Sequence, residues 1–213
     1  MSRKTKRFLI KLISVIVLSI GAVVMLIPFI WMLSTSFKDI SDVFKYPPTF
    51  FGDVFHWQNY VNVFSTINFW GMFKNTVLVT VAVVMGQLVT STMAGFGFTY
   101  LKFRGRDVIF KIFLFAVMIP FYVMLIPTFA LLRQLKLINS LWALILPCIV
   151  SPIGIFLMRQ SYLSIPKSLG DAAAIDGCSP WGIFWRIFLP LSKPTMTTLT
   201  IFAFMNTWND FIR

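Results

Sequence analysis

Apolar residues along this chain form five long, nearly uninterrupted runs, separated by short polar stretches. The runs cover approximately residues 12–33, 76–100, 108–132, 141–158 and 194–212. A hydrocarbon layer about 30 Å thick is crossed by roughly 20 helical residues, since each adds about 1.5 Å. Continuous apolar runs satisfy their backbone groups in lipid as helices, whereas barrel strands alternate. The pattern therefore predicts an all-α, polytopic membrane helix bundle with five transmembrane helices.

Composition and charge agree with this prediction. Hydrophobic residues make up 58% of the chain, charged residues 12%, and the mean hydropathy is +0.82, which is far from the soluble globular range. Basic residues concentrate at positions 3–11, 102–111 and 159–193 and are fewer in the intervening loops. The positive-inside rule then predicts a cytoplasmic N-terminus and a multi-pass protein. The net charge of +12 is explained by topology, so nucleic acid is not an expected partner.

Candidate catalytic chemistry is sparse. The chain has seven acidic residues, all of them Asp, and no glycine-rich phosphate loop. Cys148 and Cys178 form neither a disulfide framework nor a metal-ligand set, and His56 lies beside Trp57 in an external aromatic loop. We expect no catalytic, cofactor or metal site on this chain, and thus no enzyme.

Proline and glycine interrupt two of the runs. Pro120 and Pro127 fall in the third run, and Pro147 and Pro152 in the fourth. Such breaks need partners from neighbouring helices or from a wet cavity, so they indicate either a translocation pathway or kinked helices that only pack. Small residues of the second run, including Gly86, Gly95 and Gly97, predict a helix-contact face. Ionisable residues at membrane depth are almost absent, which disfavours an ion-coupled carrier.

The stretch "DAAAIDGCSPWGIFWRIFLP", residues 171–190, interrupts the apolar pattern. Ser164 and Pro166 predict the start of a helix, and Gly177 predicts its end in a left-handed conformation. Ser179 predicts the cap of a second helix that stops at Pro190. Two such short helices are marginal alone and too polar for lipid, so they need a partner surface. The pattern indicates a docking element, with an amphipathic loop as the alternative.

The same stretch carries a recognisable motif: an acidic residue, two alanines, three residues, glycine, nine residues, then Ile-x-Leu-Pro. This motif resembles the signature of binding-protein-dependent ABC transporter permeases. The matching residues are Asp171, Ala172, Ala173, Gly177, Ile187, Leu189 and Pro190. Asp171 stands where the family usually has Glu, and its side chain is one methylene shorter. Stretches such as "MIPFYVMLIPTFALLRQLKLINS" and "GIFLMRQSYLSIPKSLGDAAAIDG" are similar to the maltose-type subunits of carbohydrate importers.

The resemblance implies one ABC permease transmembrane domain over residues 1–213 and a cytoplasmic coupling loop over residues 159–192. The family has six spans, so the resemblance implies that the C-terminal span is missing from this sequence. The implied partners are a second homologous permease, an ATPase dimer, an extracellular solute-binding protein, membrane lipid and a sugar. ATP and Mg²⁺ would bind to the ATPase, with no cofactor on this chain. The implied location is a bacterial or archaeal cell membrane.

Residue roles follow from the same resemblance. Asp171 would meet a polar or basic residue in a groove of the ATPase, Ala172 and Ala173 would permit close approach, and Gly177 would make the corner. The full implied coupling set is Asp171, Ala172, Ala173, Asp176, Gly177, Ile187, Leu189 and Pro190.

Substrate identity is open at this level. An ABC permease for glycerol phosphate or a polyamine is the main alternative to a sugar importer, and a secondary carrier or a structural scaffold is a weaker one. Near the end of the last run, Asn206, Trp208, Asn209 and Asp210 offer hydrogen-bonding groups and an aromatic face to a sugar. The same residues can cap a helix or pack at the membrane interface, and we favour that interpretation for them.

Overall fold

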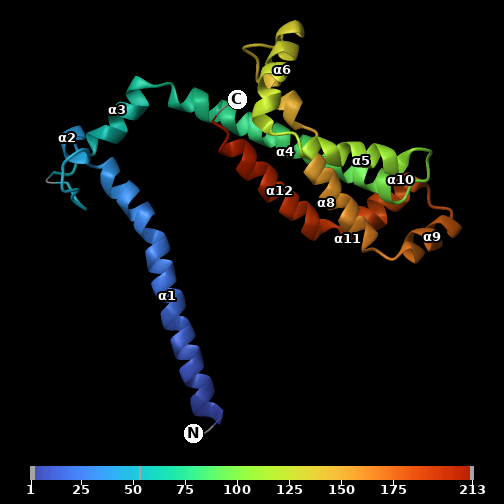
Figure 1. The fold of residues 1–213 in the computed structure, drawn as a ribbon, viewed down its shortest axis with the longest axis horizontal. Helices are drawn as coiled ribbons and strands as arrows, with labels where there is room; N and C mark the ends of the chain where they lie inside the picture. Colours follow the sequence, from blue (N-terminus) through green and yellow to red (C-terminus); the bar gives the residue numbers. More distant parts are fainter. Residues whose placement is uncertain (1–2, 53, 212–213) are drawn as a thin grey trace. The chain divides into compact units, whose positions relative to one another are not determined.

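The computed structural model describes residues 3–52 and 54–211, and within these ranges it is helical without strands. The chain divides into two units, residues 1–69 and 70–213, which are described separately (Figure 1). Three helices of the described residues are long and apolar enough to cross a membrane, or up to five if each of two bent helix pairs makes one span. The structure therefore confirms an all-α protein with several membrane helices.

The first unit contains one long helix and a folded aromatic loop. Helix α1 (Arg3–Ser36) includes the whole predicted first span, and its apolar side chains are exposed, as expected of a surface that faces lipid. The short helices α2 (Ile40–Val43) and α3 (Gln58–Thr66) follow. The ring of Phe37, which precedes α2, stacks on that of Phe55, which follows it, at a centroid distance of 3.9 Å. Lys38 is buried, and its ammonium lies 4.8 Å from the centroid of the Trp31 ring.

Helix α4 (Phe69–Thr99) is the longest helix of the second unit, and α5 (Arg106–Val117), α8 (Pro152–Leu163) and α12 (Lys193–Trp208) lie along it (Figure 1). Its predicted contact face is confirmed at two glycines. A Cβ atom at Gly86 would lie 2.7 Å from Cγ2 of Ile149, and one at Gly95 would lie 2.8 Å from Cβ of Met158. Gly97 has nothing within 4 Å of that position, so the prediction was wrong there.

The third apolar run does not form one straight helix. It divides into α5 and α6 (Phe121–Gln134), whose axes differ by 103°. The break lies at Pro120, which has φ −59° and ψ 135° and precedes the first residue of α6. Pro127, by contrast, lies inside α6 without ending it. The predicted interruption of residues 108–132 is thus confirmed at Pro120, because proline removes a backbone donor and disfavours the helical conformation of the residue before it, and it is wrong at Pro127.

The fourth run is interrupted as predicted. Helix α7 (Leu141–Ile145) runs into the 3₁₀-helix η1 (Leu146–Cys148), and α8 begins after Ser151. Carbonyl groups at the break are satisfied by side chains of α4. Gln87 donates from Nε2 to the carbonyl oxygen of Cys148 at 2.8 Å, and Thr90 donates from Oγ1 to that of Ile149 at 2.7 Å. Neighbouring polar side chains therefore compensate for the broken helix, as membrane depth requires.

Helix α12 corresponds to the fifth predicted run but is shorter than expected. It has 16 residues, and the cap that follows Trp208 is Asn209. Residue 212, where the predicted run ended, lies outside the described residues. The axis of α12 is bent by 75° from the helical stretch Pro180–Leu191 that precedes it. The predicted docking segment therefore leads directly into α12, with a sharp bend between the two.

Candidate functional site

The segment around Gly177 forms the predicted helical corner. Helix α9 (Lys167–Ile175) ends there, and Gly177 has φ +82°, a left-handed conformation that glycine adopts at little cost. The N–H of Cys178 donates to the carbonyl of Ala173 at 2.9 Å, and that of Gly177 donates to Ala174 at 3.1 Å. This pair of bonds closes the last turn of α9 in the Schellman arrangement. The predicted left-handed corner is confirmed.

The second helix starts as predicted but ends differently. Ser179 caps α10 (Pro180–Ile183) by accepting a hydrogen bond from the N–H of Gly182 at 3.2 Å. The chain then continues through a π-helix, η2 (Phe184–Phe188), and the short α11 (Leu189–Leu191). Pro190 therefore does not stop the helix, because the wider π turn shifts the hydrogen-bond register just before the proline ring.

The start of α9 also differs from the prediction. Ser164 is the residue that ends α8, and Pro166 precedes the first residue of α9 instead of occupying its first turn. The side chain of Ser164 donates to the carbonyl of Ser161 at 2.7 Å, so it completes α8. Asp171 consequently lies in the second turn of α9, one turn away from the positive end of the helix dipole.

One face of the segment is anchored on the bundle. Ala173, Ile187 and Leu189 pack against a buried cluster from α4, α8, α12 and the segment itself: Phe96, Met158, Tyr162, Ile165, Ile183, Phe184, Phe188 and Leu199. The hydroxyl of Tyr100 donates to the carbonyl of Gly170 at 3.2 Å, and a Cβ atom at Gly170 would lie 2.6 Å from the Tyr100 ring. Three of the predicted coupling residues thus serve internal packing.

The opposite face is exposed. Asp171, Ala172, Asp176, Gly177 and Pro190 all lie on the surface. The aromatic residues of α10 and η2 divide in the same way, since Phe184 and Phe188 are buried whereas Trp181 and Trp185 are exposed. Ile175 was missed by sequence reasoning, although it is 86% exposed at the end of α9. A large apolar residue that follows three alanines at the end of a predicted short helix is the signal that would have found it.

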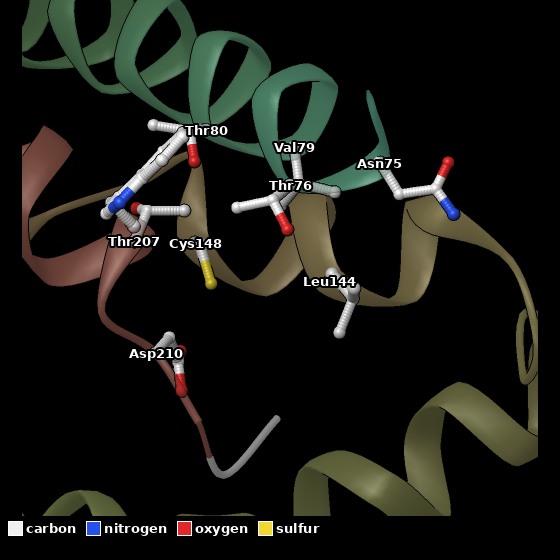
Figure 2. Close-up of a pocket in the computed structure, with 9 residues that line it drawn as sticks. Asn75, Thr76, Val79, Thr80, Leu144, Cys148, Thr207 and Asp210 are labelled. Carbon is white, nitrogen blue, oxygen red and sulfur yellow. The ribbon is translucent and has the colours of Figure 1, made fainter. Parts of the chain in front are cut away.

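A second candidate site is a cavity between α4, the α7–η1 region and α12 (Figure 2). Its volume is about 170 Å³, and it is lined by Asn75, Thr76, Val79, Thr80, Leu144, Cys148, Thr207, Trp208 and Asp210. Figure 2 shows Thr76 and Thr80 projecting from α4 toward the side on which Cys148 and Asp210 lie. A larger cavity of about 540 Å³ shares Cys148, Thr207 and Asp210 with it.

The four predicted sugar-contact residues all line one or both cavities. Trp208 and Asp210 line the smaller cavity, and Asn206, Asn209 and Asp210 line the larger one. Two of them also have packing or capping contacts. The ring of Trp208 stacks on Phe204 at 5.4 Å, and Asn209 donates from Nδ2 to the carbonyl of Met205 at 2.8 Å. Their contact with solute stays a prediction.

The charge of the two linings is informative. Among the described residues that line either cavity there is no Lys, Arg or His, and Asp210 is the acidic one. The remaining polar groups are hydroxyls and amides from residues such as Thr80, Ser151 and Asn206. Such groups suit an uncharged, hydroxyl-rich solute better than an anion. In the described part of the chain, no three His, Cys, Asp or Glu residues gather as metal ligands.

Curated relatives cover most of the chain. It is 34% identical over 215 residues to the arabinooligosaccharides transport system permease protein AraQ of Halalkalibacterium halodurans, a match that covers 100% of this chain and 77% of that protein. It is 40% identical over 161 residues to the protein of the same name from Bacillus subtilis, covering 75% of this chain and 57% of that protein.

The fold has a solved counterpart as well. A crystal structure of a bacterial ABC transporter involved in the import of the acidic polysaccharide alginate contains a chain that superposes with a TM-score of 0.79 at 27% identity, covering 98% of this chain and 73% of that chain. The family model of the binding-protein-dependent transport system inner membrane component matches residues 86–212, a range that includes the Gly177 corner and the lining of the larger cavity. Family, relatives and fold agree with the apolar helices, and the chain is a multi-pass membrane transport subunit that belongs to the family of binding-protein-dependent transport system inner membrane components.

Proposed function

We propose that this chain is one of two permease subunits of an ATP-driven oligosaccharide importer, and that its segment 159–192 docks on a partner ATPase. The observation that carries the proposal is the two-faced corner at Gly177. Ala173, Ile187 and Leu189 pack on the bundle core, whereas Asp171 and Ala172 are exposed. A short element that packs on the bundle with one face and exposes the other is suited to receive force from a partner.

The membrane side of the segment follows from topology. Basic residues before the first span favour a cytoplasmic N-terminus under the positive-inside rule. If the bent pair α5 and α6 makes one crossing, four crossings separate the N-terminus from residue 164. An even number returns the chain to the side on which it began, so the segment lies in the cytoplasm, where an ATPase and its ATP and Mg²⁺ are available.

Sugar is the solute that the cavities favour. Two relatives are named for arabinooligosaccharides, and the structural relative is described as an importer of a polysaccharide. The absence of a cation among the described lining residues weighs against a phosphorylated solute such as glycerol phosphate, which Arg or Lys would be expected to bind. Asp210 is the one carboxylate among the described lining residues, which is a sparse set for an ion-coupled carrier.

The partners follow from this function. A second homologous permease completes the pathway, and an extracellular solute-binding protein delivers the sugar. The first test is reconstitution of the four-component importer in proteoliposomes, with ATP inside and the binding protein outside. The solutes offered are arabinotriose, maltotriose and glycerol 3-phosphate. We expect ATP-dependent uptake of at least one of the two sugars and none of glycerol 3-phosphate.

One variant separates docking on the ATPase from folding of the subunit. Ile175→Ser removes the exposed apolar side chain without touching the buried cluster, so the subunit should insert and fold normally. We expect lower recovery of the ATPase with the permease pair and lower uptake. Uptake of glycerol 3-phosphate alone would contradict the sugar assignment, and full ATPase recovery with a deleted 171–177 corner would contradict the docking assignment.

A further inference from the structure

Almost all threonine hydroxyl groups in α4 and α12 have a hydrogen-bond partner in the protein. In α4, Thr90 donates to the carbonyl of Ile149 at 2.7 Å, and Thr76, Thr92 and Thr99 each donate to the carbonyl four residues earlier, at 2.7–3.0 Å. In α12, Thr197, Thr198 and Thr200 do the same, and Thr195 bonds to Ser161 at 2.9 Å. This local bond is the usual solution for a hydroxyl in an apolar helix.

Thr80 departs from that pattern. Its side chain is 2% exposed, and its Oγ1 is buried without a hydrogen-bond partner in the structure. A buried hydroxyl without a partner costs free energy, because it has lost its water and gained nothing in return. Its neighbours do not explain the exception, since Val79 and Val83 beside it belong to an apolar cluster.

The position of Thr80 supplies a reason. It lines the cavity of about 170 Å³ together with Thr76, Thr207, Trp208 and Asp210. At about 30 Å³ per molecule of liquid water, the cavity has room for roughly five or six waters, or for a group of comparable size. Figure 2 shows the side chain of Thr80 on the cavity side of α4. Thr207, on the facing helix α12, likewise lacks a side-chain hydrogen bond among those of the described residues.

We propose that Thr80 and Thr207 form a hydroxyl-recognition subsite that binds one ring of the transported sugar. The proposal rests on the proposed sugar importer function and adds residues of α4 to it. A threonine hydroxyl donates one hydrogen bond and accepts others, which matches the donor and acceptor character of a sugar hydroxyl. The Asp210 carboxylate accepts from further hydroxyls, and the Trp208 ring offers an apolar face to the ring carbons.

The test compares three substitutions in the reconstituted importer, with whichever of arabinotriose and maltotriose the wild type imports. Thr80→Val replaces the hydroxyl by a methyl group of similar size and breaks no hydrogen bond within the protein. Loss of one neutral hydrogen bond to the sugar lowers uptake at subsaturating sugar roughly 2- to 12-fold. Thr80→Ser keeps a hydroxyl at the site and is expected to restore uptake.

Thr92→Val is the matched control. Thr92 lies on the same helix and is 4% exposed, but its hydroxyl donates to the carbonyl of Leu88 and it does not line the cavity. Wild-type uptake is expected for this variant. The thermal midpoint of Thr80→Val in detergent is expected to equal or exceed that of the wild type, whereas a structural role for the hydroxyl would lower it.

A second readout uses Cys148, which lines the same cavity. In a Cys178→Ser background, the sugar that is imported should slow labelling of Cys148 by a small maleimide, and Thr80→Val should weaken that protection. Wild-type uptake and protection in Thr80→Val would overturn the subsite while leaving the importer function intact. If the wild type imports neither sugar, the importer function and the subsite fall together.

Discussion

Gly177→Ala isolates the backbone conformation of the coupling corner. An ideal Cβ atom at this position meets nothing within 4 Å, so the substitution creates no clash. The cost comes from φ +82°, which an L-residue adopts with a penalty of about 1–2 kcal/mol. If the corner relaxes to avoid this penalty, the ratio of correct to relaxed corners falls by roughly 5- to 30-fold. The relaxed corner rotates the exposed end of α9 relative to its anchored face.

A graded series tests this reasoning. Asn enters the left-handed region more readily than Ala, so Gly177→Asn should retain more uptake than Gly177→Ala. Gly177→Asp adds a negative charge beside Asp176, and we expect it to abolish transport while the subunit remains inserted. The expected order of uptake is Gly, Asn, Ala, Asp.

Gly105 provides a matched control elsewhere in the chain. It has φ +80°, nothing lies within 4 Å of its ideal Cβ position, and it precedes α5. Gly105→Ala therefore carries a similar intrinsic penalty outside the coupling corner. The assay is sugar uptake in cells, normalised to the amount of the subunit in the membrane. Undiminished uptake by Gly177→Asp at wild-type levels, or an equal loss from Gly105→Ala, would refute the assignment of the corner to coupling.

Three further predictions concern the exposed face of α9 and the packing of α8 on α4. Asp171→Lys should reduce recovery of the ATPase in a pull-down if the docking groove is basic, and full recovery would count against a basic groove. Ile175→Ser removes an apolar side chain whose burial is worth about 1.5–3 kcal/mol. The affinity of the permease for the ATPase, measured by titration, should therefore weaken about 10- to 100-fold. An unchanged affinity would exclude Ile175 from the interface. Gly154→Ala would place a Cβ atom 2.5 Å from Oγ of Ser91, and should lower the thermal midpoint in detergent by overpacking worth about 1–3 kcal/mol. Adding Ser91→Ala should recover part of that loss, since it removes a hydroxyl that has no partner; no recovery would locate the strain elsewhere.

Hydropathy and turn chemistry predicted much of this fold. The apolar runs located the membrane helices because lipid leaves a long uncharged run few alternatives to a helix, although three of them, and not five, form single helices long enough to cross a membrane in the described residues. Gly177 and Ser179 predicted the corner, because each residue determines the conformation of its own backbone or binds its nearest neighbours in the chain. Pro147 and Pro152 gave the break in the fourth run for the same local reason.

Features that depend on tertiary contacts were not predictable in this way. Pro120 bends its span by 103°, whereas Pro127 seven residues later leaves α6 intact, and nothing local to either proline distinguishes them. Pro190 lies inside a helix because the π turn before it shifts the hydrogen-bond register. Ala172 and Ala173 are adjacent and identical in type, yet the first is exposed and the second packs on the core. Which face is buried depends on how the segment lies against α4 and α8.

Helix α4 touches both candidate sites, and this explains how a docking event can reach the solute. Phe96 packs in the cluster that anchors the coupling segment, and Thr80 lines the cavity sixteen residues earlier on the same helix. That separation is about 24 Å along the axis. Between these points, the hydrogen bonds from Gln87 and Thr90 hold the broken region before α8 to α4. Because packed helices move largely as rigid bodies, a shift imposed at Phe96 displaces Thr80 and the Cys148 wall together. Under the proposed function, the continuous helix α4, and not the bent pair α5 and α6, transmits closure of the ATPase to the sugar.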